Sequence, residues 1–148
     1  AEDFKLATGT FVSVGPLRAR IIAAGAPYVQ DAVITGLNLN EVGALLVPTP
    51  DLRKLTDLPA NPPWAQVVTH ARVQAWLQDL VDGLARQATG SANRVARMLI
   101  LTEPPSLDKG EVTDKGSINQ RAVLKHRAAL VQALHEGSAE HIATPRPT

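Results

Sequence analysis

Two lysines, each followed by glycine, are the residues of this sequence best suited to chemistry. Lys109 and Lys115 both lie in the polar segment 108–119, DKGEVTDKGSIN. A lysine on a glycine-flanked loop can reach into the cleft of another domain. There its ammonium group balances the charge of a phosphate or of a developing carboxylate. The alternative is an ordinary solvated turn, which the residue types taken alone favour.

The sequence contains no other complete motif for catalysis or binding. It has no cysteine, which excludes disulfides, thiolate metal sites and a cysteine nucleophile. Neither a glycine-rich phosphate-binding loop nor a GxSxG nucleophile motif is present. We expect no metal site. The four histidines have no evident partner, and we expect them on helix surfaces. They are His70, His126, His135 and His141.

A basic cluster and two tryptophans are the remaining candidates. The cluster consists of Arg121, Lys125 and Arg127. We interpret it as the solvated side of the last helix, with contact to an anionic cofactor as the alternative. Trp64 and Trp76 are twelve positions apart, and Trp76 lies in an apolar helical stripe, so we expect it in the core.

Composition limits the class of protein. The 148 residues correspond to one domain, or one domain with a tail. A net charge of +1 argues against a nucleic-acid platform. Hydrophobic residues make up 45%, enough for a core of Ala, Val, Leu and Ile. No apolar run reaches the roughly 18 residues of a membrane span. The chain starts at Ala1 rather than Met, so we expect it to be processed or cut from a longer protein.

The first third of the chain predicts a hairpin, a helix and two strands. Residues 4–14, FKLATGTFVSV, place short β-prone runs on either side of Gly9, and glycine adopts the positive φ of a reversal at little cost. A helix is expected over 16–24, beginning at a proline. Val29, Ala32, Val33 and Ile34 predict a strand over 28–36, and the continuous apolar run 43–48 predicts a buried strand paired with it.

The rest of the chain alternates helical stripes with loops. Residues 102–117 form a long polar loop between a predicted buried strand and a predicted helix, and such a loop is typical of a functional segment. The element order predicts an α+β fold, a small sheet with an N-terminal β-hairpin packed by helices. The expected segments are a proline-rich connector (57–64), a long helix (64–88), a strand (95–101), the loop (102–117), a helix (118–135) and a flexible tail (137–148).

Two segments resemble a known family. They are residues 2–18, EDFKLATGTFVSVGPLR, and residues 102–127, TEPPSLDKGEVTDKGSINQRAVLKHR. Both resemble the C-terminal domain of adenylate-forming, AMP-binding acid–CoA ligases, in particular the feruloyl-CoA synthetase-like branch. The first is similar to the stretch after the family's hinge, and the second to its terminal lysine loop. Under this resemblance, residues 1–136 form the C-terminal lid domain, with a less familiar insert at about 59–93.

The resemblance implies an ATP-dependent activity shared between two domains. Such enzymes use ATP and Mg²⁺ to convert a carboxylic acid, here feruloyl or a similar aryl or acyl acid, into an acyl adenylate, and then transfer the acyl group to CoA. A large N-terminal AMP-binding domain holds the ATP and the acid. The small domain rotates, presenting its lysine loop in the first step and its hairpin in the second.

The resemblance also implies where this fragment works and what it lacks. We expect a cytoplasmic protein that is inactive without its partner domain. The absence of cysteine fits that reducing compartment. The alternative is a stand-alone protein-interaction or small-ligand-binding module, and a complete small transferase is the least favoured reading. An AMP-binding domain encoded upstream of Ala1 would distinguish the first reading from the others.

Carried over residue by residue, the first segment predicts a hinge and a binding turn. Ala1 would lie at or beside the hinge, and Lys5 matches the lysine that often follows it. The turn formed by Thr8, Gly9 and Thr10 would meet the pantetheine arm of CoA, where glycine allows close approach of the backbone.

The second segment departs from the family pattern at the lysine itself. The family pattern is Thr-x-x-Gly-Lys, whereas residues 113–117 read TDKGS. A strict alignment therefore places Ser117 at the catalytic position. We expect Lys115 to take that role from two residues earlier, because it is the only lysine flanking Gly116. Gly116 is accordingly assigned to the cofactor-binding turn.

Overall fold

A three-stranded sheet forms the centre of the protein. This computed structural model describes residues 2–147, and Ala1, the expected hinge residue, lies outside them. The central strand β4 (Val42–Pro48) pairs antiparallel with β3 (Val29–Thr35) and parallel with β5 (Val95–Ile100). Both faces of the sheet are covered, which explains why the central strand β4 reads as a continuous apolar run. The predicted strands and the predicted β3–β4 pair are confirmed.

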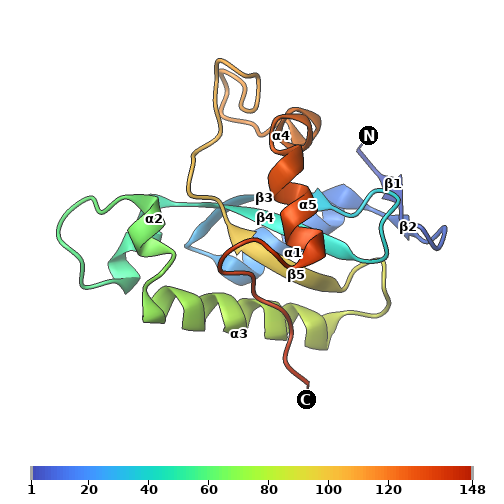
Figure 1. Ribbon diagram of the computed structural model, residues 1–148, viewed down its shortest axis with the longest axis horizontal. Helices are drawn as coiled ribbons and strands as arrows, with labels where there is room; N and C mark the ends of the chain where they lie inside the picture. The colour runs from blue at the N-terminus through green and yellow to red at the C-terminus, as the bar shows by residue number, and fades with distance from the viewer. Residues whose placement is uncertain (1, 148) are drawn as a thin grey trace.

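Helices cover the two faces of the sheet separately (Figure 1). On one face, α1 (Val14–Gly25) and α3 (Ala71–Gln87) pack on strand residues such as Ala44 and Met98. On the other, α4 (Gln120–His126) and α5 (Ala128–Glu136) pack on neighbours such as Leu45 and Leu99. Alternate strand residues point to opposite faces, so one sheet serves two cores. This is the predicted α+β architecture.

The predicted N-terminal hairpin is also confirmed. Strand β1 (Phe4–Lys5) pairs antiparallel with β2 (Phe11–Val12). The hairpin is held at the end of the main sheet by backbone bonds to the β3–β4 turn. The amide of Asn38 donates to the carbonyl of Lys5 at 3.0 Å, and the amide of Ala7 donates to the carbonyl of Leu39 at 2.8 Å.

The two long helices predicted from hydrophobic periodicity are each broken in two. The first consists of α2 (Trp64–Val67) and α3, separated at His70. The Nε2 of His70 bonds the Asp57 carboxylate at 2.8 Å, and its Nδ1 accepts from the amide of Arg72 at 3.1 Å. His70 thus starts a new helix. The second breaks at Arg127, between α4 and α5, where φ is −114° and ψ is 30°.

The region expected as an insert contributes to the core. It contains α2 and α3, whose buried face includes Val73, Leu77 and Leu84. Trp76 packs edge-on against Tyr28, with ring centroids 5.6 Å apart, as expected of a core aromatic. The 3₁₀ helix η1 (Pro50–Leu55) lies between β4 and α2 in the chain.

Residues 137–147, for which the sequence predicts a flexible tail, are held against the sheet and α3. Met98 and Ala143 exchange two backbone hydrogen bonds, of 3.0 and 2.8 Å. Arg146 forms a 2.7 Å ion pair with Asp82, and its amide bonds the same carboxylate. These bonds lower the pKa of Asp82 to about 2. Hydrogen bonds hold this segment in place, and the sequence gives no local sign of them because the segment has no hydrophobic pattern.

One glycine sets the spacing between α5 and the sheet. Gly43 of β4 lies opposite Thr35 of β3, and a Cβ placed on it would lie only 3.0 Å from Leu134 and 3.1 Å from His135, both on α5. The absent side chain lets Nε2 of His135 reach the hydroxyl of Thr35 at 2.7 Å. His135 is therefore a partly buried hydrogen-bonding residue, not the surface residue that was expected.

The environment of His135 predicts a pH-dependent stability. Burial lowers the pKa of His135, nearby Arg97 lowers it further, and Glu41 partly opposes them. The folded state favours the neutral ring. Below the ordinary histidine pKa of 6.5, the unfolded chain therefore binds more protons than the folded chain does. Stability is therefore expected to fall as the pH drops below that value. Urea midpoints measured between about pH 7.5 and about pH 5.5 should decline, and less so in His135→Gln. His126→Gln, on an exposed position, is the matched control, and an undiminished decline in His135→Gln would contradict the assignment.

Within residues 2–147, no helix is both long enough and apolar enough to cross a membrane.

Candidate functional site

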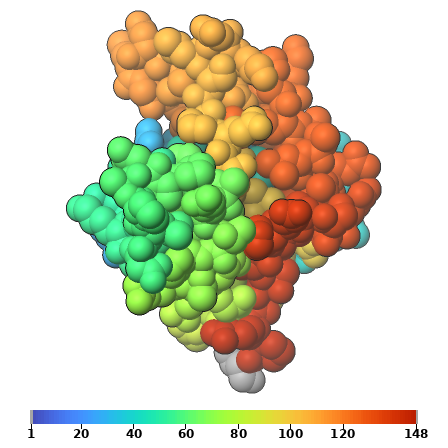
Figure 2. Space-filling model, turned by 60° about the vertical axis from the view of Figure 1, so that its left-hand side comes forward, coloured from blue at the N-terminus to red at the C-terminus, as the bar shows by residue number. Residues whose placement is uncertain are grey.

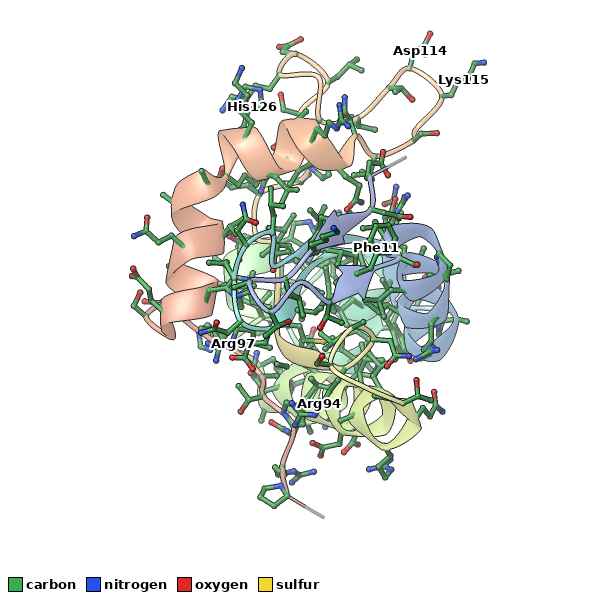
Figure 3. The ribbon with its side chains drawn as sticks, turned by 90° about the vertical axis from the view of Figure 1, so that its right-hand side faces the viewer. Phe11, Arg94, Arg97, Asp114, Lys115 and His126 are labelled. Atoms are coloured by element: carbon green, nitrogen blue, oxygen red, sulfur yellow. The ribbon has the colours of Figure 1, made fainter. Side chains whose placement is uncertain are left out.

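Residues 113–117, which we call the lysine turn, lie at the tip of a loop that projects from one end of the domain (Figures 2 and 3). Its base is a bridge between Val112 and Ile118. Within the turn, the amide of Thr113 donates to the carbonyl of Ser117 and the amide of Gly116 donates to the carbonyl of Thr113, both at 2.9 Å. Figure 3 shows Lys115 pointing away from the body of the domain.

Glycine is needed in this turn for its backbone conformation. Gly116 has a φ of +83°, and a Cβ added there would meet no atom within 4 Å. Space is therefore not the constraint, whereas the left-handed φ is. Lys115, directly before it, is exposed and has no ion pair among the described residues. The turn presents an ammonium group that is free to meet a ligand.

The base of the loop is fixed by a buried ion pair that the sequence did not predict. Arg127 donates from Nε to Oε2 of Glu111 at 2.9 Å and from Nη2 to Oε1 at 3.0 Å. The amide of Ser106 also donates to Oε1, at 2.9 Å. Hydrogen bonding to Arg127 is the main cause that lowers the pKa of Glu111, and it outweighs burial. Glu111 is thus a buried, ionised anchor.

The same arginine also holds the start of the loop. Its Nη1 donates to the carbonyl of Glu103 at 2.8 Å, and its Nη2 donates to that of Pro104 at 3.1 Å. The interpretation of the basic cluster is therefore wrong for Arg127, which binds the loop instead of facing solvent. Arg121 and Lys125 are exposed, as predicted.

A glutamine fixes the helix that follows the loop to the sheet. Gln120, the first residue of α4, is buried against the free edge of β3. Its Oε1 accepts from the amide of Ile34 at 3.0 Å, and its Nε2 donates to the carbonyl of Ala32 at 2.9 Å. Asn119 caps the helix by accepting from the amide of Ala122 at 3.1 Å. An Asn before a helical pattern is a recognisable signal, whereas the glutamine's distant partners are not.

The hairpin turn forms the second arm of the candidate site. Gly9 has a φ of +85°, and its amide donates to the carbonyl of Leu6 at 2.8 Å. The hydroxyls of Thr8 and Thr10 lie 2.9 Å apart across the turn. Lys5 extends from β1 as an exposed side chain. The predicted reversal is confirmed, and its tip is open to solvent.

The structure keeps the two predicted groups apart. Thr8, Gly9 and Thr10 lie in the hairpin, whereas Lys115 and Gly116 lie on the projecting loop (Figure 1). Among the described residues, no hydrogen bond or ion pair joins the two turns. Nor does that part of the chain contain a group of three or more acidic or histidine side chains that could hold a metal ion.

The hairpin-led α+β fold is that of a known class, the C-terminal domains of adenylate-forming enzymes. Residues 3–139 match the family described as the AMP-binding enzyme C-terminal domain, and the chain belongs to that family. No curated protein sequence matches it significantly.

The fold is similar to parts of the adenylation domains of carboxylic acid reductases. The A domain from Segniliparus rugosus, in complex with AMP and a co-purified carboxylic acid, has a TM-score of 0.66 and 24% identity, over 93% of this chain and 20% of that chain. The A-PCP didomain of the same organism, in complex with AMP, gives 0.65 and 24%, over 93% and 18%. The adenylation domain from Mycobacterium chelonae gives 0.61 and 23%, over 90% and 19%. The chain therefore spans about a fifth of these structures, and the similarity concerns the fold.

Proposed function

We propose that this chain is the C-terminal domain of an acid–CoA ligase that activates feruloyl or a similar aryl acid. The observation that carries the proposal is the free, exposed ammonium group of Lys115 on a turn whose base is anchored by Glu111 and Arg127. The hairpin tip is a second exposed turn on the same domain. The partner of this chain in the proposal is an N-terminal AMP-binding domain, which holds the ATP, the Mg²⁺ and the acid.

In the first step the acid carboxylate attacks the α-phosphorus of ATP. A carboxylate oxygen–phosphorus bond forms, the bond to the β-phosphate oxygen breaks, and pyrophosphate leaves with the electron pair. Negative charge accumulates on the oxygens around phosphorus as this happens. Lys115 supplies the opposing charge there, and such a contact is worth most in a cleft from which water is excluded.

In the second step the domain rotates and the hairpin replaces the lysine loop. The thiolate of CoA attacks the acyl carbon, a carbon–sulfur bond forms, and AMP leaves. The turn of Thr8, Gly9 and Thr10 lies against the pantetheine arm, where a side chain at Gly9 would obstruct the approach. One rigid domain thus completes the site for each step with a different arm.

The proposal is tested in the full-length enzyme. Acid-dependent exchange of labelled pyrophosphate into ATP should occur with aryl acids in the presence of Mg²⁺. AMP release should then depend on CoA, and the 148-residue chain alone should catalyse neither step. Absence of exchange with every aryl acid would contradict the proposal. Transfer to a carrier-protein thiol but not to CoA would instead favour the arrangement of the A-PCP didomain.

A substitution at the hairpin tip should separate the two steps. Gly9→Ala places a Cβ on a residue with a φ of +85°, which costs about 1–2 kcal/mol in that conformation. We expect acyl transfer to CoA to fall about tenfold, with pyrophosphate exchange unchanged. Gly90→Ala is the control for the added methyl group alone, because Gly90 is also exposed, an added Cβ there would meet nothing within 4 Å, and its φ is not left-handed. Equal loss of both half-reactions in Gly9→Ala would contradict the separate role of the hairpin.

A further inference from the structure

The geometry points to Arg127 as the residue that positions Lys115 for adenylation, acting through Glu111. This inference rests on the proposed function of Lys115 and extends it to two residues remote from the tip of the turn. Arg127 is a positioning residue in this scheme, because its guanidinium group binds the base of the loop and not the reacting atoms.

Side-chain packing does little to hold residues 102–110 of the loop in place. Residues 102–104 and 107–110 are exposed, and Leu107, its largest apolar side chain, is 61% exposed. Glu111 is 1% exposed, and at the base of the lysine turn Ile118 is buried in the apolar cluster under α4 and α5, with Val112 packed against that cluster. Residues 102–110 have no apolar core of their own and must be ordered by polar contacts, and these converge on the carboxylate of Glu111.

Glu111 joins the two limbs of the loop. Its amide donates to the carbonyl of Ser106 and its side chain accepts from the amide of the same residue, both at 2.9 Å, which closes the first limb. Its carbonyl accepts from the amide of Asn119 at 2.9 Å, which closes the second. The second limb carries the bridge between Val112 and Ile118 and, beyond it, the lysine turn. The position of Glu111 therefore sets the position of the turn that carries Lys115.

Arg127 connects this junction to the body of the domain. It lies between α4 and α5, and those helices are fixed by buried Val123 and Leu134 and by the bonds of Gln120 to β3. Its guanidinium group donates to the Glu111 carboxylate and to the carbonyls of residues 103 and 104. The bend that interrupts the predicted helix thus lies where the loop is attached.

The planar fork of arginine suits this task better than an ammonium group. All three nitrogens of the guanidinium group are used, Nε and Nη2 on the carboxylate and Nη1 and Nη2 on the carbonyls. Lysine would preserve one charge contact but could not hold both limbs in one plane. Loss of the cation would leave a buried carboxylate without a counter-charge, and the base of the loop would have to open to hydrate it.

Displacement of the turn is expected to affect the rate of one half-reaction. A shift of about 1 Å in a group that acts in the transition state can cost about a hundredfold in rate. The hairpin arm is attached elsewhere, by backbone bonds to Asn38 and Leu39, so the thioester step is expected not to depend on Arg127. Substrate binding is expected to change little, since the ATP and acid sites belong to the partner domain under the proposed function.

The test uses Arg127→Met, Arg127→Lys and the control Arg72→Met, an exposed arginine on α3, in the full-length enzyme. In Arg127→Met we expect the kcat of pyrophosphate exchange to fall at least about tenfold, with KM for ATP and acid within about threefold. Thioester formation from preformed acyl adenylate should stay within about twofold. Amide hydrogen exchange over 106–119 should rise. Arg127→Lys should recover part of the rate, and Arg72→Met should match the parent.

A double substitution separates this inference from the proposed function. If Arg127 acts only by placing Lys115, then Arg127→Met should cause no further loss of adenylation in a Lys115→Ala background. A silent Lys115→Ala variant together with faster amide exchange in Arg127→Met would overturn the proposed role of the lysine and leave the anchoring intact.

Two results would overturn the positioning role itself. One is unchanged adenylation and unchanged amide exchange in Arg127→Met. The other is an equal loss of both half-reactions, which would show a general structural role. Should Arg127→Met not fold, Glu111→Gln tests the same contact, because it preserves the shape and removes the charge. It is expected to lower the kcat of adenylation selectively, and an effect on neither step would count against the inference.

Discussion

Replacing Lys115 with alanine in the full-length enzyme is expected to lower acid-dependent pyrophosphate exchange about 10²–10³-fold, the usual effect of removing one preorganised charge or donor from a transition state. The exposed turn gives Lys115 no ion pair within the described residues, so its loss should leave the domain folded. Thioester formation from preformed acyl adenylate should remain within about threefold of the parent, because the hairpin serves that step. Single-turnover measurements of the two steps check this directly.

Two neighbouring substitutions provide the controls for this prediction. Lys109→Ala removes the other lysine that precedes a glycine, and Ser117→Ala removes the side chain at the position where the family pattern has lysine. Both are expected to change exchange by less than about threefold. A silent Lys115→Ala variant would overturn the assignment. A large loss in Ser117→Ala instead would show that the strict register of the family pattern applies.

The largest expected effect on stability is that of Gly43→Ala. The new Cβ would lie 2.5 Å from Oγ1 of Thr35, besides its close approach to Leu134 and His135. Because the strands and α5 cannot all move away, we expect the chain to lose about 1–3 kcal/mol of unfolding free energy, as for other overpacked cores. The His135–Thr35 hydrogen bond should break as α5 is displaced. Urea unfolding, with an unchanged m-value and a lowered midpoint, checks this.

Gly83→Ala is the matched control for the same chemical change. Gly83 lies inside α3, where an added Cβ would meet only Nη2 of Arg86, at 3.6 Å. Alanine is the better helix former, so this variant should gain about 0.5–1 kcal/mol. The opposite signs at Gly43 and Gly83 are the diagnostic result. A neutral or stabilising Gly43→Ala would show that α5 does not pack on β4 as closely as described.

Local sequence patterns were sufficient for the strands and the hairpin. The run 43–48 is apolar throughout, as a central strand covered on both faces must be, the run 95–101 is apolar apart from Arg97, and Gly9 marks the reversal. Periodicity was insufficient for the helices, because it continues unbroken through His70 and Arg127. At each break the side chain of that residue forms a polar bond to a residue elsewhere in the chain.

The candidate site divides in the same way. The lysine turn could be predicted because Lys115 and Gly116 are adjacent and glycine supplies the conformation. Its supports could not, since Arg127 and Glu111 are 16 positions apart and Gln120 is 86 positions from its β3 partner. An arginine on a polar helix face carries no local sign that it will bind a buried carboxylate.

Both outer edges of the main sheet are occupied by other parts of the same chain. The carboxamide of Gln120 substitutes for a strand beside β3, and the backbone of Ala143 does so beside β5. An unpaired edge is a template for strands of other molecules. Gln120 and Ala143 occupy backbone groups at the two edges and so reduce the sites where a strand of another molecule could pair. A chain that loses these contacts should associate through its sheet edges more readily than the intact domain does.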